Sequence, residues 1–224
     1  MQRRFSYALT AGLLCSGAPM NMAGTRLGRP LLLALFGYVL GRQADELAEL
    51  SETDPLTWLL NARGFSARLH VEIKRAKRYG EPLSLLFLDV DGLKDINDRY
   101  GHRAGSDALR EVASVIRAEL RETDTGARWG GDEFTILAPR TATVNATAFA
   151  ERIRASIAQH AAPWPVTVSI GIATLGDGEK GPAGAQHLIR DADRAMYEAK
   201  RRGKNTVVAV QQNGAAEAAP FCFV

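Results

Sequence analysis

Apolar residues along the middle of the chain follow strand and helix periodicities in turn. The nearly unbroken apolar run from Leu83 to Val90 predicts a buried strand, and the alternating pattern from Val166 to Ala173 predicts another. Shorter strands are predicted over Gly126 to Trp129, Phe134 to Leu137 and Thr206 to Val210.

Helical spacing of apolar positions separates these strands. Asn61 can cap a helix that runs to Tyr79, where Gly80 stops it. Further helices are predicted over Leu93 to Tyr100, Ser106 to Leu120, Phe149 to Ala161 and His187 to Arg201.

The order of these elements predicts the fold class. Gly130 and Gly131 suit a tight turn between two short strands, so at least one pair of strands is antiparallel. We therefore expect an α+β fold, a mixed central β-sheet covered by helices, with a ferredoxin-like split βαβ core as the nearest simple template.

The patterned region, residues 53–210, is predicted to be one domain of the 224-residue chain. Residues 43–52 are interpreted as a short connecting helix, and residues 211–224 as a flexible tail without periodicity. Residues 1–42 form an apolar N-terminal segment, and the region from Met1 to Glu52 is expected to be too short for an ordinary independent input domain.

The N-terminal segment contains two apolar runs, Phe5 to Leu14 and Pro30 to Leu40, and neither reaches the roughly 20 apolar residues of a membrane span. We expect an interfacial segment that contacts the membrane or a partner, on a cytoplasmic protein associated with the inner face of the membrane. Cys15 and Cys222 are too few for a disulfide framework, which favours a reducing compartment. A net charge of +3 gives no reason to expect a nucleic-acid partner.

Four acidic residues are the candidates for chemistry. Asp89 and Asp91 end a buried strand, and Asp132 and Glu133 follow the glycine turn. If the strand and the turn are neighbours, Asp89 and Asp132 can share a hard cation such as Mg²⁺. Gly92, Leu93 and Lys94 would then offer backbone amides at a helix start and a positive charge to phosphate oxygens.

Each of these signals alone has an ordinary structural explanation. Asp91 is more simply a helix N-cap, and the two glycines more simply a hairpin turn. Lys200, with the arginines that follow it, is more simply a solvated cluster that complements a helix dipole. Only their joint occurrence points to phosphoryl transfer.

The joint pattern resembles the GGDEF family of bacterial nucleotide cyclases. The matching blocks are LDVDGLKDINDRYGH from Leu88, ARWGGDEF from Ala127, SIGIA from Ser169 and ADRAMYEAKRRGKN from Ala192, and DPLTWLLNARGF from Asp54 resembles the family's N-terminal motif. So many blocks in order make coincidence very improbable.

The resemblance implies a role for each matching residue. Asp89, the Val90 carbonyl and Asp132 would hold Mg²⁺ or Mn²⁺, with Glu133 beside them as the acid/base group and with Asp89, Asp132 and Glu133 as the catalytic set. The remaining positions would bind the nucleotide, with lysine at 204 where the family usually has arginine: Gly92, Leu93, Lys94, Asn97, Ser106, Leu109, Lys200 and Lys204.

The family reaction joins two nucleoside triphosphates, GTP in a diguanylate cyclase, by attack of a ribose 3′-hydroxyl on an α-phosphate. Since each domain holds one nucleotide, turnover implies a homodimer. Arg121 and Asp124 resemble the family's inhibitory product site, which implies feedback inhibition by cyclic di-GMP. The ordinary explanation of these two residues is a surface ion pair at a helix end.

Ser106 is the main departure from the family, which has aspartate at this position as the acceptor for guanine. A hydroxyl both donates and accepts, so it tolerates adenine. Losing a charged buried hydrogen bond relaxes discrimination by roughly 1.5 to 3 kcal/mol. Serine here resembles a minor branch that makes mixed cyclic AMP-GMP, and two hypotheses stay open: a promiscuous cyclase that accepts GTP and ATP, or an ordinary diguanylate cyclase with a weakened guanine pocket.

A different class of function also fits the family, namely a catalytically silent module that binds cyclic di-GMP at Arg121 and Asp124. The intact acidic residues Asp89, Asp132 and Glu133 argue against it.

Overall fold

The computed structural model describes residues 33–42, 51–160, 164–175 and 184–210. The chain divides into two compact units, Met1–Ser51 and Glu52–Val224. In the first unit, residues 33–42 form a helix, and no helix of the described part of the chain is both long and apolar enough to cross a membrane. The predicted connecting helix as far as residue 50, most of the N-terminal segment and the predicted tail lie outside the described residues.

A six-stranded mixed sheet forms the centre of the second unit, in the order β1-β3-β4-β2-β5-β6. The central strand β2 pairs antiparallel with β4 and β5, whereas β1 with β3 and β5 with β6 are parallel pairs. This arrangement confirms the predicted fold class. The strands are β1 (Leu60–Asn61), β2 (Leu83–Asp91), β3 (Thr125–Arg128), β4 (Glu133–Pro139), β5 (Thr167–Leu175) and β6 (Val207–Ala209).

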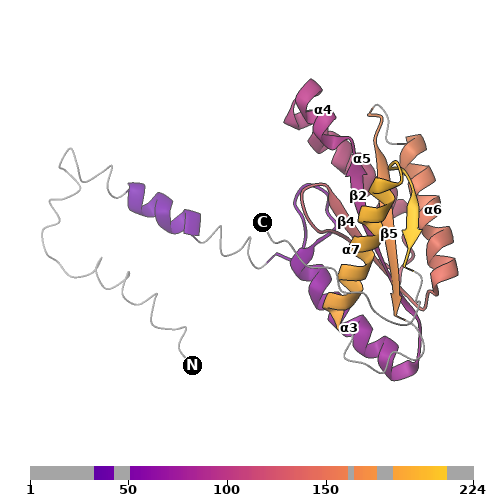
Figure 1. Cartoon of the computed structure of the whole chain (residues 1–224). Coiled ribbons are helices and arrows are strands. Elements are labelled where there is room, and N and C mark those ends of the chain that lie inside the picture. Colours follow the sequence, from indigo (N-terminus) through magenta and orange to yellow (C-terminus); the bar gives the residue numbers. More distant parts are fainter. Residues whose placement is uncertain (1–32, 43–50, 161–163, 176–183, 211–224) are drawn as a thin grey trace, which may run out of the picture. The chain divides into compact units, whose positions relative to one another are not determined.

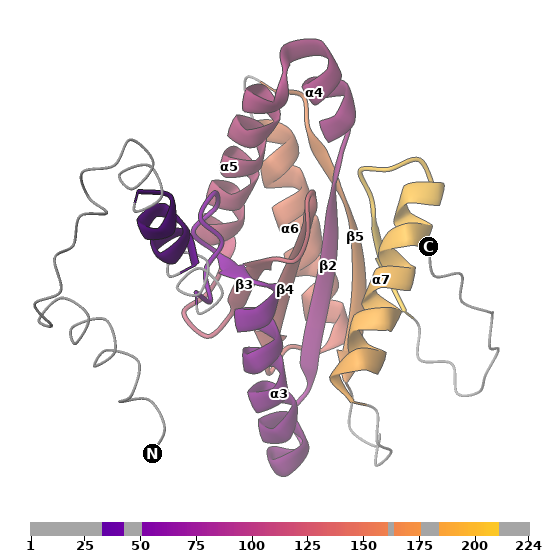
Figure 2. The same ribbon diagram turned by 90° about the vertical axis from the view of Figure 1, so that its left-hand side faces the viewer.

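Helices cover both faces of this sheet (Figures 1 and 2). They are α3 (Ala62–Tyr79), α4 (Leu93–Tyr100), α5 (His102–Glu119), α6 (Thr143–His160) and α7 (Ala185–Arg201). Side chains of β2 alternate between two cores. Leu86 and Leu88 pack with residues of α5 and α6, and Leu85 and Phe87 pack with residues of α3 and α7. Burial on both sides explains why β2 reads as a continuous apolar run.

The predicted ends of α3 are confirmed. The Asn61 side chain accepts a hydrogen bond from the Gly64 N–H at 2.9 Å, and Gly80 adopts the left-handed conformation with φ 64°. Two predicted starts were wrong, because α5 begins at His102 rather than Ser106 and α6 begins at Thr143 rather than Phe149. The short strand β1 was not predicted.

Helix α7 lies unusually close to β5. A Cβ atom placed on Gly171 would come within 2.1 Å of the Ala192 carbonyl oxygen and of the Met196 nitrogen, so only glycine fits at this position. This close packing fixes α7 against the sheet and leaves its last turn, which contains Lys200, beside the end of β2.

Candidate active site

Three acidic residues meet where β2 ends beside the turn between β3 and β4. Asp89 lies opposite Glu133 in the antiparallel register, and the Val90 N–H donates to the Asp132 carbonyl oxygen at 3.0 Å. The strand and the turn are therefore neighbours, which was the condition for Asp89 and Asp132 to act together.

This acidic site is electrostatically unfavourable by itself. Burial raises the pKa of Asp89, helped by the nearby charges of Asp132 and Asp91 and opposed by Lys200. Burial also raises the pKa of Glu133, and the charges of Asp89 and Asp132 add to the increase. Carboxylates that are crowded together and partly buried in this way favour the binding of a cation.

Lys200 supplies one such cation. Its Nζ lies 2.6 Å from Asp89 Oδ2, and the lysine side chain is one-third exposed while the aspartate is buried. The ion pair joins the last turn of α7 to the end of β2. If the Lys200 ammonium group binds phosphate oxygens, those phosphates lie directly beside the acidic site.

The residues present fit a hard divalent cation. Within the described residues, no three His, Cys, Asp or Glu side chains converge as a complete metal cluster. The predicted set instead consists of the Asp89 and Asp132 carboxylates with the Val90 carbonyl, and Mg²⁺ characteristically completes such a partial set with water and substrate phosphates. Repulsion between two neighbouring carboxylates is relieved when a cation binds between them, so this pair suits a divalent ion.

A pocket of about 530 Å³ adjoins the acidic site. It brings together residues of α4, of α5 and of the turn after β3, including Lys94, Asn97, Ser106, Leu109 and Asp132. Asn97 packs over Gly105, since a Cβ on that glycine would lie 2.0 Å from Asn97 Oδ1. Five predicted nucleotide-binding positions, Leu93 among them, line this one hollow.

Ser106 lines the pocket and also makes a side-chain hydrogen bond within helix α5. Its hydroxyl donates to the His102 carbonyl oxygen at 3.0 Å, which leaves the oxygen lone pairs as acceptors. Asp107, the neighbouring carboxylate, pairs with Arg110 on the same helix and is not among the pocket residues. Only Ser106 of these two faces the pocket.

The N-cap interpretation of Asp91 was wrong. Helix α4 begins after Gly92, which occupies the N-cap position with a left-handed φ of 79°, and no side chain makes a capping hydrogen bond. The Asp91 carboxylate instead accepts hydrogen bonds from Thr167 and Ser169 on β5 and from the Asn205 N–H. Asp91 thus has a structural role next to the predicted metal ligands.

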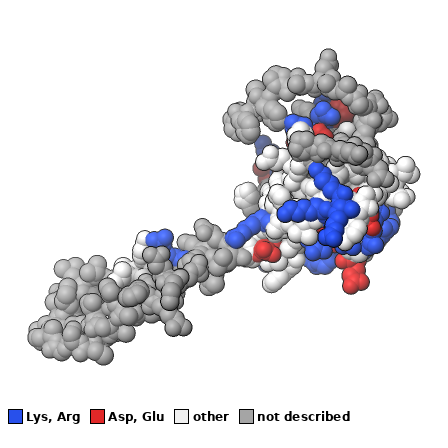
Figure 3. Space-filling view, turned by 90° about the horizontal axis from the view of Figure 1, so that it is seen from below, with Lys and Arg blue, Asp and Glu red and all other residues white. Residues whose placement is uncertain are grey.

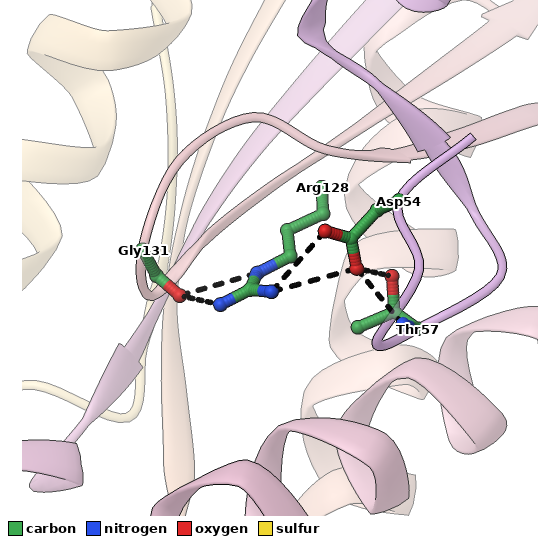
Figure 4. A network of polar contacts seen from close by, with 4 residues as sticks. All are labelled: Asp54, Thr57, Arg128 and Gly131. Atoms are coloured by element: carbon green, nitrogen blue, oxygen red, sulfur yellow. Dashed lines mark hydrogen bonds and ion pairs between the residues drawn. The ribbon is translucent and has the colours of Figure 1, made fainter. Parts of the chain in front are cut away.

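Arg128 braces the turn that carries Asp132 (Figure 4). Its guanidinium donates to the Gly131 carbonyl oxygen at 2.7 Å and to Asp54 Oδ2 at 3.3 Å. Asp54 also accepts from the Thr57 N–H at 2.8 Å and from the Thr57 hydroxyl at 2.6 Å. The motif that contains Asp54 was recognised in the sequence, but the hydrogen bonds between Asp54 and Arg128 were not predicted. The only signal was the position of Arg128 just before the glycine turn.

The remaining predicted residues lie in two other places. Lys204 is exposed in a left-handed turn after α7, with φ 66°. Asp124 Oδ2 accepts from the backbone N–H of Arg121 at 3.0 Å, in the loop after α5, and the Arg121 side chain is exposed. The carboxylate therefore shapes the loop and leaves the guanidinium accessible, an arrangement different from a simple side-chain ion pair.

Positive charge also gathers away from this site. Figure 3 shows Lys and Arg side chains outnumbering Asp and Glu on the face of the structure seen from below. The C-terminal end of α3 lies at the bottom of Figures 1 and 2, and a hollow there is lined by Lys74, Arg75, Arg78, Tyr79 and Glu81. Basic side chains thus also line a surface at the C-terminal end of α3.

This fold and site agree with the comparisons with known proteins. The family model described as "Diguanylate cyclase, GGDEF domain" matches residues 51–206. The chain belongs to the GGDEF domain family.

Characterised relatives include response regulator PleD of Caulobacter vibrioides, 40% identical over 172 residues, which cover 73% of this chain and 37% of PleD. Diguanylate cyclase DgcP of Pseudomonas aeruginosa is 40% identical over 158 residues, covering 68% of this chain and 23% of DgcP. The chain thus matches well under half the length of these relatives.

Solved structures are similar over the same region. The GGDEF domain of DgcB from Caulobacter crescentus, in complex with c-di-GMP, is 33% identical with a TM-score of 0.66, covering 71% of this chain and 95% of that domain. Diguanylate cyclase SiaD of Pseudomonas aeruginosa, in complex with its activator SiaC, is 31% identical with a TM-score of 0.66, covering 91% of this chain and 82% of SiaD.

Proposed function

We propose that the protein is a nucleotidyltransferase that condenses two GTP molecules into cyclic di-GMP. The observation that carries this proposal is the convergence of Asp89, Asp132 and Glu133 with Lys200 beside a pocket lined by Lys94, Asn97 and Ser106. The relatives named as diguanylate cyclases support the same reaction.

In this mechanism the pocket between α4 and α5 holds the base, with Asn97, Ser106 and Leu109 as contacts. The amides of Gly92 and Leu93, with Lys94, Lys200 and Lys204, hold the triphosphate. Lys200 leaves Asp89 and turns to phosphate when the nucleotide enters. Asp89, the Val90 carbonyl and Asp132 would hold a divalent ion, which would supply charge stabilisation at the phosphates.

The chemical step forms a bond between the ribose 3′-oxygen of one nucleotide and the α-phosphorus of the other. The bond from the α-phosphorus to the bridging oxygen breaks, and pyrophosphate leaves. Glu133 accepts the 3′-hydroxyl proton, and its raised pKa brings it closer to the neutral range that favours a general base. Two such transfers between two facing domains close the ring, so the active species is a homodimer.

The exposed Arg121 guanidinium and the loop held by Asp124 support a second role for the product. Cyclic di-GMP carries two phosphates, and a free guanidinium is suited to bind them. We therefore expect cyclic di-GMP to inhibit its own synthesis at this loop. A silent receptor of cyclic di-GMP at the same residues is the alternative function.

One experiment separates these functions. Purified full-length protein is incubated with Mg²⁺ and GTP, with ATP, or with both, and the products are separated by mass. Cyclic di-GMP that disappears in the Asp132→Asn variant supports the cyclase. Absence of product from a folded protein that still binds cyclic di-GMP would establish the receptor instead.

The same assay decides the nucleotide preference. The Ser106 hydroxyl already donates to His102, so it accepts from the guanine N–H groups without rearrangement, whereas adenine N1 requires the hydroxyl to turn. We propose that GTP is preferred and that ATP enters to give some cyclic AMP-GMP. Ser106→Asp should then lower the mixed product relative to cyclic di-GMP, and an unchanged ratio would show that Ser106 does not set selectivity.

A further inference from the structure

The buried carboxylate of Asp91 lies two residues beyond Asp89 on β2, and its hydrogen bonds run to β5 and to the turn after α7. It is 7% exposed. Oδ1 accepts from the Ser169 hydroxyl at 2.9 Å, and Oδ2 accepts from the Thr167 hydroxyl at 2.9 Å and from the Asn205 N–H at 3.1 Å. Asp91 therefore connects β2 both to β5 and to the turn after α7.

That turn has an unusual backbone. Gly203, Lys204 and Asn205 have φ values of 112°, 66° and 44°, so two successive non-glycine residues adopt the left-handed region. Such conformations persist only where the surroundings hold them. Here the Asn205 N–H donates to Asp91, and Asn205 Oδ1 accepts from Arg154 of α6 at 2.8 Å.

We propose that Asp91 is a positioning residue for nucleotide binding, which fixes the turn that carries Lys204 relative to the strand that carries Asp89. Arg154 holds the same turn from the other side, through its hydrogen bond to Asn205 Oδ1. This inference rests on the proposed function, in which Lys204 binds the triphosphate. A lysine binds phosphate as a point charge at the end of a flexible side chain. Its contribution to nucleotide affinity therefore depends on where the backbone places its Cα atom.

The contacts of Asp91 make the proposal testable by substitution. Asp91→Ala removes every acceptor for Asn205, whereas the amide of Asp91→Asn keeps one oxygen for the Asn205 N–H and can donate to the Ser169 hydroxyl, which also accepts. A positioning role is therefore lost with alanine and restored with asparagine. A role that required the negative charge of Asp91 would be lost with both.

The experiment measures the Kd of α,β-methylene GTP with Mg²⁺ by calorimetry, using the full chain. We expect Asp91→Ala and Lys204→Ala each to weaken binding by about tenfold. The double variant should bind within about twofold of Lys204→Ala alone, since both changes remove the same contact. Asp91→Asn should bind like the unmodified protein.

Ser84→Ala is the matched control. Ser84 is a buried polar residue at the other end of β2, bonded to the Thr141 carbonyl and to Thr174, so its loss affects stability without touching the turn. If Asp91→Ala does not fold, Arg154→Gln tests the same turn from the opposite side and should also be non-additive with Lys204→Ala.

Multiplicative effects of Asp91→Ala and Lys204→Ala, or an Asp91→Asn variant as weak as Asp91→Ala, would overturn the inference. With Arg154→Gln in place of Asp91→Ala, a multiplicative effect would overturn it equally. Because the analogue does not react, these outcomes are independent of turnover. A protein that binds the analogue but makes no cyclic dinucleotide would refute the proposed function alone.

Discussion

Lys200 Nζ lies 2.6 Å from Asp89 Oδ2, so the last turn of α7 already supplies a positive charge to the acidic site. Burial and the neighbouring carboxylates raise the pKa of Asp89, and the lysine acts against them through a hydrogen bond and its charge. The ion pair thus opposes the rise in the pKa of a buried carboxylate before any nucleotide binds. It also holds the lysine next to the position where phosphates are expected.

Replacing Lys200 with glutamine should raise the pKa of Asp89 further, because the opposing charge is lost while burial remains. Protonation of Asp89 would then begin at a higher pH than in the unmodified protein. Carboxyl-carbon NMR of the nucleotide-free protein, titrated without metal, measures this directly. The exposed Lys94→Gln variant is the control, and equal Asp89 titration in both variants would contradict the coupling.

Arg128 should be required for placing the turn that carries Asp132. Arg128→Gln removes the contacts with Gly131 and with Asp54, so we expect product formation to fall by about tenfold or more, as for loss of a charged hydrogen bond. Asp54→Asn should act through the same residue, and the two effects should not add in the double variant. Initial rates of cyclic di-GMP formation provide the measurement, and fully additive effects would show that Asp54 does not act through Arg128.

Much of the fold was predictable because buried strands and helices place apolar residues at regular, recognisable spacings in the sequence. Strand β2 is apolar throughout since it is covered on both faces, and the Asn61 and Gly80 signals mark the two ends of α3. The first turns of α6 were missed because Thr143, Val144 and Asn145 are weak helix formers and come before the apolar spacing begins.

Other features depend on contacts between distant segments. Strand β1 is two residues long and is defined by its pairing with β3. Two residues are too few to show a periodic pattern of apolar positions. The acidic pairs were recognisable from their place after a strand and a glycine turn. The partners of Asp91 and Arg128 were not, since Thr167 and Asp54 are 76 and 74 residues away from them along the chain.

Gly105→Ala should separate stability from binding. Alanine favours the interior of α5 by about 1 kcal/mol over glycine. Its Cβ would meet Asn97 Oδ1 at 2.0 Å, so the Asn97 side chain must leave its place in the pocket. We expect the melting temperature to hold or rise while GTP affinity falls. Ser114→Ala, at an exposed site of α5, should change neither, and an unaltered GTP affinity in Gly105→Ala would remove Asn97 from the proposed base contacts.

Glu119 should make stability depend on pH through the contact between α5 and α6. Its carboxylate accepts from the Ser156 hydroxyl at 2.7 Å and from Arg152 Nε at 2.5 Å, and these bonds lower its pKa below the ordinary value of 4.5. A lowered pKa in the folded state gives stability that is present above pH 4.5 and is lost as the pH falls through the folded-state value.

Glu119→Gln should therefore lower the free energy of unfolding at pH 7 by about 1 kcal/mol, a value that allows for solvent screening of the half-exposed Arg152. The difference from the unmodified protein should shrink in acid, where Glu119 is protonated in both states. Urea denaturation of the full chain between pH 7 and pH 3 measures it, with Glu122→Gln, an exposed glutamate of the following loop, as control. A difference that stays constant over this range would mean that packing of the side chain, rather than its charge, stabilises the contact between α5 and α6.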